Sequence, residues 1–235
     1  MRGEERTMRV QLLSYTPEPE QVAAAAARLC YSSADISQLM ERSRDDHAAL
    51  LAKILDLGHF SVLEHASFTF GIEGISRACS HQLVRHRIAS YSQQSQRYVA
   101  VSERFAAVMP PKIAENPQLA GRFEQFLNDC HELYGELMAA GIPAEDARFV
   151  LPNAAATKLV MTMNARELRH FFALRCCRRA QWEIRAMATA MLRACKPVAP
   201  LLFADAGPGC LAGACPEGKM TCGQATAVRQ EFKNV

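Results

Sequence analysis

The chain has 235 residues, of which 49% are hydrophobic and 22% charged, so it is long enough to bury a substantial core. Its formal net charge of +3 is too small to require nucleic acid, although it is compatible with small anionic ligands held in local basic pockets. No run of about 18 apolar residues could span a bilayer, and the first ten residues lack the apolar segment of a signal peptide. We therefore expect a cytoplasmic protein with no membrane or nucleic-acid partner.

Strand-like and helix-like patterns follow one another along the chain. Runs rich in apolar or aromatic residues predict strands at 8–16, 66–74 and 157–164. Helical spacing predicts helices at 17–31, 45–59 (with Gly58 as its stop), 75–87, 119–140, 143–151, 165–175 and 180–195. No repeat or linker divides them. We expect a single α/β domain at 1–203, in which long helices flank a central, mostly antiparallel sheet, and an irregular Cys- and Gly-containing extension at 204–235.

A basic segment, "VRHRIASYSQQSQRY", runs from Val84 to Tyr98 and contains no acidic residue. The nearest carboxylates along the chain are Glu73 and Glu103. A guanidinium beside hydroxyl and amide donors suits phosphate, because it forms forked charge-assisted hydrogen bonds. A solvated helix end explains the triplet 85–87 equally well from local sequence. The segment thus predicts either a phosphate site or an exposed basic turn.

A second cluster, residues 164–185, contains six arginines. Arg175 follows Leu168, Phe171 and Phe172 at helical spacing, which puts it on the apolar stripe of that helix. A buried guanidinium is costly unless an anion or several acceptors meet it, but an arginine at the end of a stripe can also extend to solvent. Spacing alone leaves both readings open. For the other arginines near the end of the cluster we expect a solvated face: Arg178, Arg179 and Arg185.

The histidines and cysteines give weaker signals. His59 and His65 are six residues apart, which is off the spacing of a helical zinc pair, so we expect no metal there. The nine cysteines lie largely in apolar helical patterns such as "ARLCYS" and "MLRACKP", and we expect buried free thiols, with Cys176 and Cys177 structural. Cys210, Cys215 and Cys222 of the tail lack a CxxC pair; we expect free thiols, with a metal or disulfide role left open. The chain also lacks GxGxxG, GxxxxGK[ST] and GxSxG.

The basic segment resembles a known family. "RHRIASYSQQSQR" fits the RHR-x7-Ser motif of the flavin-dependent thymidylate synthases, and "GHFSVLEHASFTF", "ARFVLP", "NARELRHFFALR" and "AQWEI" match in order over roughly residues 8–203. The resemblance implies a homotetramer with active sites at subunit junctions. It further implies FAD as cofactor, NADPH as its reductant, methylenetetrahydrofolate as carbon donor and dUMP as substrate, converted to dTMP.

Site residues follow from the resemblance position by position. It implies that Arg175 is catalytic, polarising the pyrimidine. It implies contacts to cofactors for His59, Ser61, Arg85, His86, Arg87, Gln93, Asn164, Ala165, Arg166 and His170. It implies contacts to dUMP for Gln82, Leu83, Val84, Arg85, Gln93, Gln94, Ser95, Gln96, Arg97, Arg175 and, from another subunit, Arg148. It implies no metal.

Two positions depart from the family pattern. The family often has Asn-Glu where this chain has Ser92 and Gln93, and many members have Asn in place of His170. Both replacements keep hydrogen-bonding capacity. Ser95 has no identifiable base beside it, so we expect it to bind dUMP rather than act as a nucleophile. Two other functions stay open, a nucleic-acid-binding module that tracks phosphates and an oxidase flavoprotein that uses NADPH without a nucleotide substrate.

Overall fold

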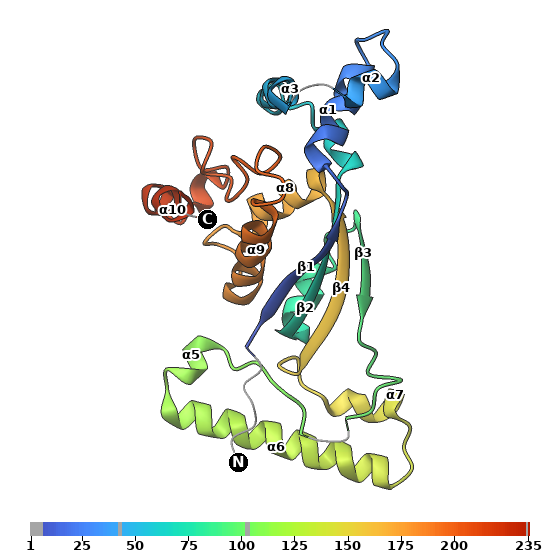
Figure 1. The fold of residues 1–235 in the computed structure, drawn as a ribbon. Helices are drawn as coiled ribbons and strands as arrows, with labels where there is room; N and C mark the ends of the chain where they lie inside the picture. Colours follow the sequence, from blue (N-terminus) through green and yellow to red (C-terminus); the bar gives the residue numbers. More distant parts are fainter. Residues whose placement is uncertain (1–6, 42–43, 102–103, 234) are drawn as a thin grey trace. The chain divides into compact units, whose positions relative to one another are not determined.

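The computed structural model describes residues 7–41, 44–101, 104–233 and 235 (Figure 1). The chain forms an α/β fold with one four-stranded antiparallel sheet in the order β1-β2-β4-β3. The expected antiparallel sheet is therefore confirmed, and three of its strands lie where the sequence predicts them. Its strands are β1 (Arg9–Tyr15), β2 (Ser67–Ser76), β3 (Ala89–Gln93) and β4 (Ala156–Asn164).

The described residues fall into two compact units. The first contains 7–9, 72–85 and 91–160, and the second contains 10–71, 86–90 and 161–233 with 235. The boundary falls inside each strand of the sheet, so no single linker separates the units. The expectation that the N-terminus is not a signal peptide falls mostly on residues 1–6, which lie outside the described residues. The predicted division at 203/204 stays a prediction.

The second unit contains most of the helices. They are α1 (Pro19–Leu29), α2 (Ile36–Met40), α3 (Arg44–Asp56), α8 (Ala165–Arg175), α9 (Trp182–Cys195), α10 (Ala225–Phe232) and the 3-10 helices η1 (Phe60–His65) and η3 (Gly218–Met220). The core of this unit is aromatic: Phe203 packs edge-on against Phe68 and Phe172, with ring centroids 5.3 and 5.9 Å apart. Such edge-to-face pairs add to the stabilisation that burial provides. This core fixes α8 against β2.

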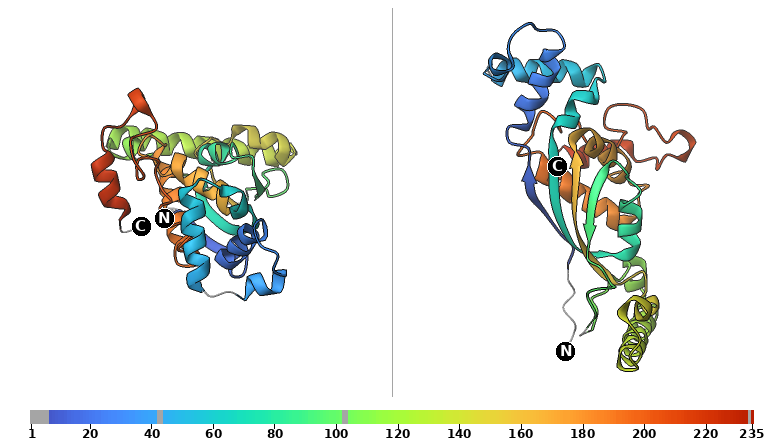
Figure 2. Two further views of the ribbon diagram at one scale, coloured as in Figure 1. Left: turned by 90° about the horizontal axis from the view of Figure 1, so that it is seen from above. Right: turned by 90° about the vertical axis from the view of Figure 1, so that its right-hand side faces the viewer.

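The first unit contains α4 (Arg77–Leu83), α5 (Pro111–Ala114), α6 (Pro117–Ala139), α7 (Ala144–Ala147) and the 3-10 helix η2 (Arg148–Val150). The long helix α6 is seen lengthwise and end-on in Figure 2. It buries one narrow stripe, Leu127, Cys130 and Tyr134, at the spacing that keeps three residues on one helix face. The Tyr134 hydroxyl accepts a hydrogen bond from the Val101 amide at 3.2 Å.

Several elements differ from the sequence prediction. The helix expected at 75–87 is α4, which ends at Leu83, so the basic triplet follows the helix instead of belonging to it. The helix expected at 143–151 divides into α7 and η2. The short elements α2, α5 and β3 were not predicted, because four or five residues carry too little periodicity. The tail was expected to be irregular, but it contains α10, which buries Val228 and Phe232.

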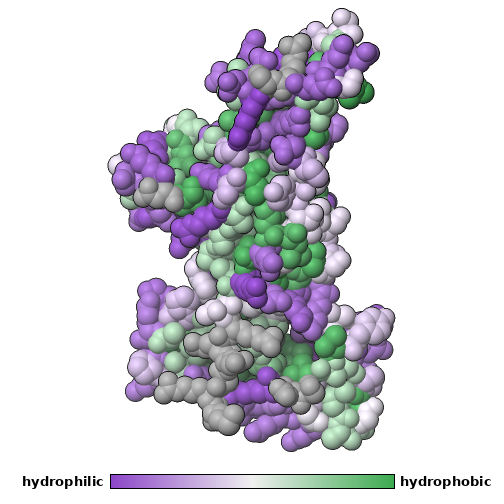
Figure 3. All heavy atoms as spheres, in the orientation of Figure 1, coloured by the Kyte–Doolittle hydropathy of each residue, from purple (hydrophilic) through white to green (hydrophobic). Residues whose placement is uncertain are grey.

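The cysteines are mostly buried, as expected, with one correction. Cys195, in the "MLRACKP" pattern, is fully buried, and burial raises the pKa of the Cys176 thiol to about 12. Cys30, in the "ARLCYS" pattern, is exposed instead, because α1 ends there and its side chain leaves the apolar face. Hydrophilic residues cover much of the face shown in Figure 3, interspersed with apolar ones. No helix in the described part of the chain is both long and apolar enough to cross a membrane.

Candidate functional site

The junction of β4 and α8 positions the first group of site residues, all in the second unit. Asn164 is the N-cap of α8, and its side-chain oxygen accepts a hydrogen bond from the Glu167 amide at 2.9 Å. The Ala165 amide donates to the Ala66 carbonyl at 2.8 Å, which ties the start of α8 to β2's entry. Ala165 is fully buried and its amide is already paired, so it offers a ligand no exposed atom. This junction fixes the direction in which α8 leaves the sheet.

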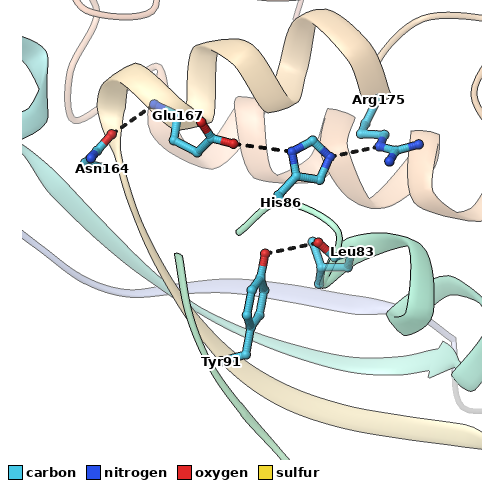
Figure 4. A network of polar contacts seen from close by, with 6 residues as sticks. All are labelled: Leu83, His86, Tyr91, Asn164, Glu167 and Arg175. Atoms are coloured by element: carbon cyan, nitrogen blue, oxygen red, sulfur yellow. Dashed lines mark hydrogen bonds and ion pairs between the residues drawn. The ribbon is translucent and has the colours of Figure 1, made fainter. Parts of the chain in front are cut away.

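A row of three side chains joins the RHR triplet to α8 (Figure 4). The Nε of Arg175 donates to Nε2 of His86 at 3.0 Å, and Nδ1 of His86 faces the Glu167 carboxylate at 3.4 Å. Because an arginine Nε can only donate, Nε2 of His86 must accept, and the ring proton lies on Nδ1. The neutral imidazole therefore donates to Glu167 and accepts from Arg175 at once.

The electrostatics of His86 agree with this neutral form. Its pKa lies below the ordinary value of 6.5, first because the ring is buried and next because the Arg175 cation is close. Glu167 acts in the opposite direction, and His170 lowers the pKa slightly. Only 6% of His86 is exposed, and its ring packs edge-on against Phe171 with centroids 4.9 Å apart. His86 is thus a buried, uncharged link between a carboxylate and a guanidinium.

Arg175 resolves the ambiguity of the apolar stripe. Leu168, Phe171 and Phe172 are fully buried on α8, and Arg175, one turn further, is half-buried and meets His86. Its Nε is engaged, whereas neither Nη atom has a hydrogen-bond partner among the described residues. The Nε of Arg175 is therefore held by His86. Its two Nη atoms stay available to an acceptor from outside the described chain.

His86, Glu167 and His170 also meet a geometric criterion for a metal site. One ligand atom from each lies within 4.8 Å of the other two, and His170 is exposed. The adjacent Arg175 cation would repel a divalent ion, however, and it already occupies Nε2 of His86. The group is better suited to an anionic or hydrogen-bonding ligand.

Other residues expected at the cofactor lie around α8 and η1. Arg166 is exposed and pairs with Glu64. His59 and Ser61, at the start of η1, are both exposed. Arg87 is exposed as well and has no carboxylate within 4 Å among the described residues. These positions offer surface donors without a fixed partner, except for Arg166.

The second group of site residues lies in the first unit, around β3. Nε2 of Gln93 donates to the hydroxyls of Ser80 at 3.0 Å and Thr157 at 3.1 Å, which holds its amide in one orientation. The Gln94 amide donates to the Lys158 carbonyl at 3.0 Å. The Ser95 hydroxyl accepts from the Arg97 amide at 3.1 Å and so caps the turn that follows. Gln96 is half-buried. The loop is thus a structured turn.

Arg97 has an acidic partner that is remote along the chain. Its guanidinium meets the Glu145 carboxylate at 2.7 Å, in an exposed pair, and Nε of Arg148 donates to the Glu145 carbonyl at 3.0 Å. Arg148 also lowers the pKa of Arg77, second to burial. Neither Arg77 nor Arg148 has a carboxylate within 4 Å in the described part of the chain. Two neighbouring guanidinium groups without a counterion form a candidate anion site.

The remaining residues expected at the substrate follow α4. Leu83 is buried, and its carbonyl accepts from the Tyr91 hydroxyl at 3.0 Å (Figure 4). Gln82 is half-buried, and Val84 and Arg85 are exposed. Arg85 has no ion pair with any described residue. Leu83 is fully buried and its carbonyl is already paired, whereas Arg85 is exposed and has no ion pair among the described residues.

Three participants were not singled out by sequence reasoning. Glu167 and Glu145 place carboxylates beside His86 and Arg97, and Arg77 lies beside Arg148. Of these three residues, only Glu167 could have been found from the sequence. It follows the Asn164 N-cap by three residues, a position whose side chain is often fixed by the first helical turn. Glu145 and Arg77 come together with their partners through tertiary folding.

Exposed arginines such as Arg85 and Arg87 are side chains of the kind that binds phosphate groups. Residues 11–201 match the family described as thymidylate synthase complementing protein, and the chain belongs to this family. It is 60% identical to the flavin-dependent thymidylate synthase of Geobacter sulfurreducens over 97% of this chain and 99% of the relative. It is 53% identical to that of Nitratidesulfovibrio vulgaris (92% and 94%) and 44% identical to that of Clostridium tetani (99% and 100%).

Proposed function

We propose that the chain is a flavin-dependent thymidylate synthase, which methylates dUMP reductively to dTMP with methylenetetrahydrofolate as the carbon donor. The relatives at 44 to 60% identity carry this name over nearly the whole chain. The structural observation that supports it most is the row Glu167–His86–Arg175, because it orients a guanidinium fork next to the RHR triplet. We further propose that the enzyme is cytoplasmic and homotetrameric.

The residues present fit the phosphates of FAD and dUMP. Arg85 and Arg87 are exposed, flank the buried His86 in sequence, and have no acidic partner in the described chain. Guanidinium groups of this kind bind phosphate oxygens with forked, charge-assisted hydrogen bonds. When bound, FAD that has been reduced by NADPH would supply the hydride that completes the methyl group. His59, Ser61, Asn164, Arg166 and His170 would hold the rest of the cofactor.

The protein's contribution to dUMP chemistry falls to the oriented donors. The fork of Arg175, next to the pyrimidine, would stabilise negative charge that develops on the ring and raise electron density at the carbon to be methylated. Gln93 would present its side-chain carbonyl oxygen as an acceptor, because its amide nitrogen already donates to two hydroxyls. Gln94, Ser95, Gln96 and Arg97 would complete the contacts, with Arg148 reaching the phosphate from another subunit.

The test is a visible spectrum of the purified chain, loaded with FAD, desalted and titrated with dUMP, followed by an assay of dTMP formation. Flavin bands that shift and saturate with dUMP are the expected result. For Arg175→Ala we expect FAD retention with dTMP formation reduced by about 100-fold or more, because a donor aimed at developing charge contributes on that order. Arg179→Ala, which changes an exposed arginine, is the matched control.

Each alternative function predicts a different spectrum. Retained flavin that ignores dUMP, with NADPH oxidised at the same rate in its presence, would indicate an oxidase. A folded protein that retains no flavin would overturn both readings and return attention to nucleic acid. In that case binding should weaken steeply with added salt.

A further inference from the structure

Four of the nine cysteines line one small cavity in the second unit, whose wall contains none of the residues assigned to the nucleotide ligands. The cavity lies between the end of α8, the loop that follows residue 207, and α10, and its wall includes Arg178. Its four cysteines are Cys177, Cys210, Cys215 and Cys222. Figure 1 shows the tail segments, drawn in red, beside α8 and α9. Three thiols come from the tail, and the fourth follows α8.

The four thiols are free and close to one another. None of them forms a disulfide, Cys210 is buried, and the other three are half-buried. Burial raises the pKa of the Cys210 thiol, and the thiols of Cys215, Cys177 and Cys222 act on it in the same direction. Four sulfur atoms around one cavity form a ligand set that is complete in number for a tetrahedral thiophilic metal.

The loop that carries the thiols is anchored from both sides. Nε of Arg229, on α10, donates to the Cys210 carbonyl at 2.9 Å, and its guanidinium also reaches the Gly213 carbonyl. Arg178 pairs with Glu231 of α10 at 3.0 Å. These contacts connect the residues after α8, the loop and α10. They place the Arg178 side chain in the wall of the cavity and the Arg229 guanidinium against the backbone of Cys210.

The backbone after Cys215 forms a tight turn. Glu217 is in the right-handed helical region (φ −73°, ψ −5°), and Gly218 follows in the left-handed region (φ 51°). The Gly218 amide donates to the Cys215 carbonyl at 3.3 Å, so the turn closes back onto a residue that carries one of the four thiols. A side chain at residue 218 would be strained, so glycine suits this turn.

We propose that Cys177, Cys210, Cys215 and Cys222 bind one thiophilic metal centre, either zinc or an iron–sulfur cluster, that fastens the tail to α8. Zinc binding replaces four S–H bonds with four metal–sulfur bonds and releases four protons to solvent, with no change in oxidation state. The resulting zinc centre carries a charge of −2, and the Arg229 guanidinium, which binds the Cys210 carbonyl, offsets part of it. The site is structural, since no position is left open for a substrate.

Metal binding requires the four sulfur atoms to move closer together. Zinc–sulfur bonds of about 2.3 Å in tetrahedral geometry place sulfur atoms about 3.8 Å apart. In the structure no three of these four sulfurs lie within 4.8 Å of one another. Rotation of the half-buried side chains toward the cavity supplies this movement, and the anchored backbone keeps them within reach.

The first measurement is the metal and sulfide content of the full-length protein, purified without chelator or affinity metal. We expect about one zinc per chain, or iron with acid-labile sulfide in the ratio of a cluster. Cys215→Ser and Cys222→Ser should each reduce the content at least about tenfold, because a missing ligand opens the site. Cys30→Ser, which changes an exposed cysteine outside the cavity, should keep it.

A second measurement uses the wild-type chain alone, in case the variants do not fold. The chain is stripped of metal under reducing conditions, titrated with Co²⁺, and then tested with a thiol-alkylating reagent. We expect thiolate-to-cobalt absorption that saturates at one ion per chain, with four thiols protected from alkylation. The proposal would be overturned if the protein is purified without metal and its stripped form binds neither Co²⁺ nor Zn²⁺. An intact mass showing disulfides among these four residues would also overturn it.

Discussion

The two ring nitrogens of His86 have opposite hydrogen-bonding roles. Nε2 accepts from Arg175, and Nδ1 donates toward Glu167, so the neutral ring with its proton on Nδ1 satisfies both. A second proton would place an imidazolium against the Arg175 guanidinium inside a buried pocket. The carboxylate of Glu167 offsets this only in part, since the pKa of His86 remains lowered. Burial and neighbouring charge thus make His86 a neutral spacer.

This arrangement predicts a pH-dependent stability. Because the folded-state pKa of His86 lies below its ordinary value of 6.5, the unfolded chain binds a proton at a pH where the folded chain does not. The stability that neutral His86 contributes to the fold is therefore complete above pH 6.5, and it is lost as the pH falls below this value. In His86→Gln, the free energy of unfolding should change less steeply between pH 7.5 and 5.5 than in the wild type. The two slopes should differ by at most about 1.4 kcal/mol per pH unit.

Denaturant unfolding at several pH values measures this difference. The groups that face His86 are Glu167, His170 and Arg175, so a change in slope reflects this cluster. His59→Gln, at an exposed position, should keep the wild-type slope. Equal slopes for His86→Gln and the wild type would show that His86 is not the residue that titrates.

At the scale of elements, the end of one strand and the start of the next helix do much of the positioning. β4 ends at Asn164 and α8 begins at the next residue, so the strand continues directly into the helix that carries Glu167, His170 and Arg175. The cap at Asn164 satisfies an amide of the first turn that would otherwise lack a partner. The direction of α8 therefore depends on a residue that is also expected at the cofactor.

Removing the cap should cost stability as well as cofactor affinity. We expect Asn164→Ala to lower the free energy of unfolding by about 1 kcal/mol, within the range measured for lost N-caps. Asn164→Ser, which keeps an acceptor for the Glu167 amide, should lose only a small part of this. Chemical denaturation of both variants gives the stability, and FAD titration gives the affinity.

The two readouts separate two roles of Asn164. If Asn164→Ser unfolds like the wild type and yet binds FAD weakly, the residue contacts the cofactor as well as capping the helix. Wild-type stability in Asn164→Ala would mean that the hydrogen bond to Glu167 does not stabilise α8.

At the scale of the whole molecule, the candidate residues are divided between two compact units. The Glu167–His86–Arg175 row belongs to one, and Gln93, Arg97 and Arg148 belong to the other. We propose that a complete site combines residues of different subunits in a homotetramer, with Arg148 supplied by a neighbour. A symmetric oligomer can build such sites because each subunit contributes the same surfaces to every junction.

Mixing of inactive chains tests this arrangement. Arg85→Ala and Arg148→Ala chains, each inactive alone, are unfolded together, refolded and assayed. If a site takes these arginines from different subunits, random assembly should restore roughly a quarter of the wild-type activity, since half of the chains supply each intact residue. Mixing Arg148→Ala chains with chains that carry both Arg85→Ala and Arg148→Ala should restore no activity. No recovery in the first mixture would contradict the shared site.

Sequence alone determined the main elements and the ligand class. The periodicities of β1, α3, α6, β4 and α8 were long enough to be identified, and "RHRIASYSQQSQR" carried a specific family resemblance. Apolar spacing also placed Arg175 on the stripe of α8, where the structure has it. These features are local, because a helix face or a short motif is read from residues that are neighbours along the chain.

Tertiary structure decided which groups meet. Glu145 reaches Arg97 across 48 residues and Glu167 reaches His86 across 81, and no local pattern predicts such pairs. The cysteines of the tail also met a partner only through folding. The spacing of Cys210, Cys215 and Cys222 lacks a CxxC pair. The packing of α10 and the loop near the end of α8 adds Cys177 as a fourth thiol. Burial, charge pairing and ligand number depend on distance in space, and folding alone fixes that distance.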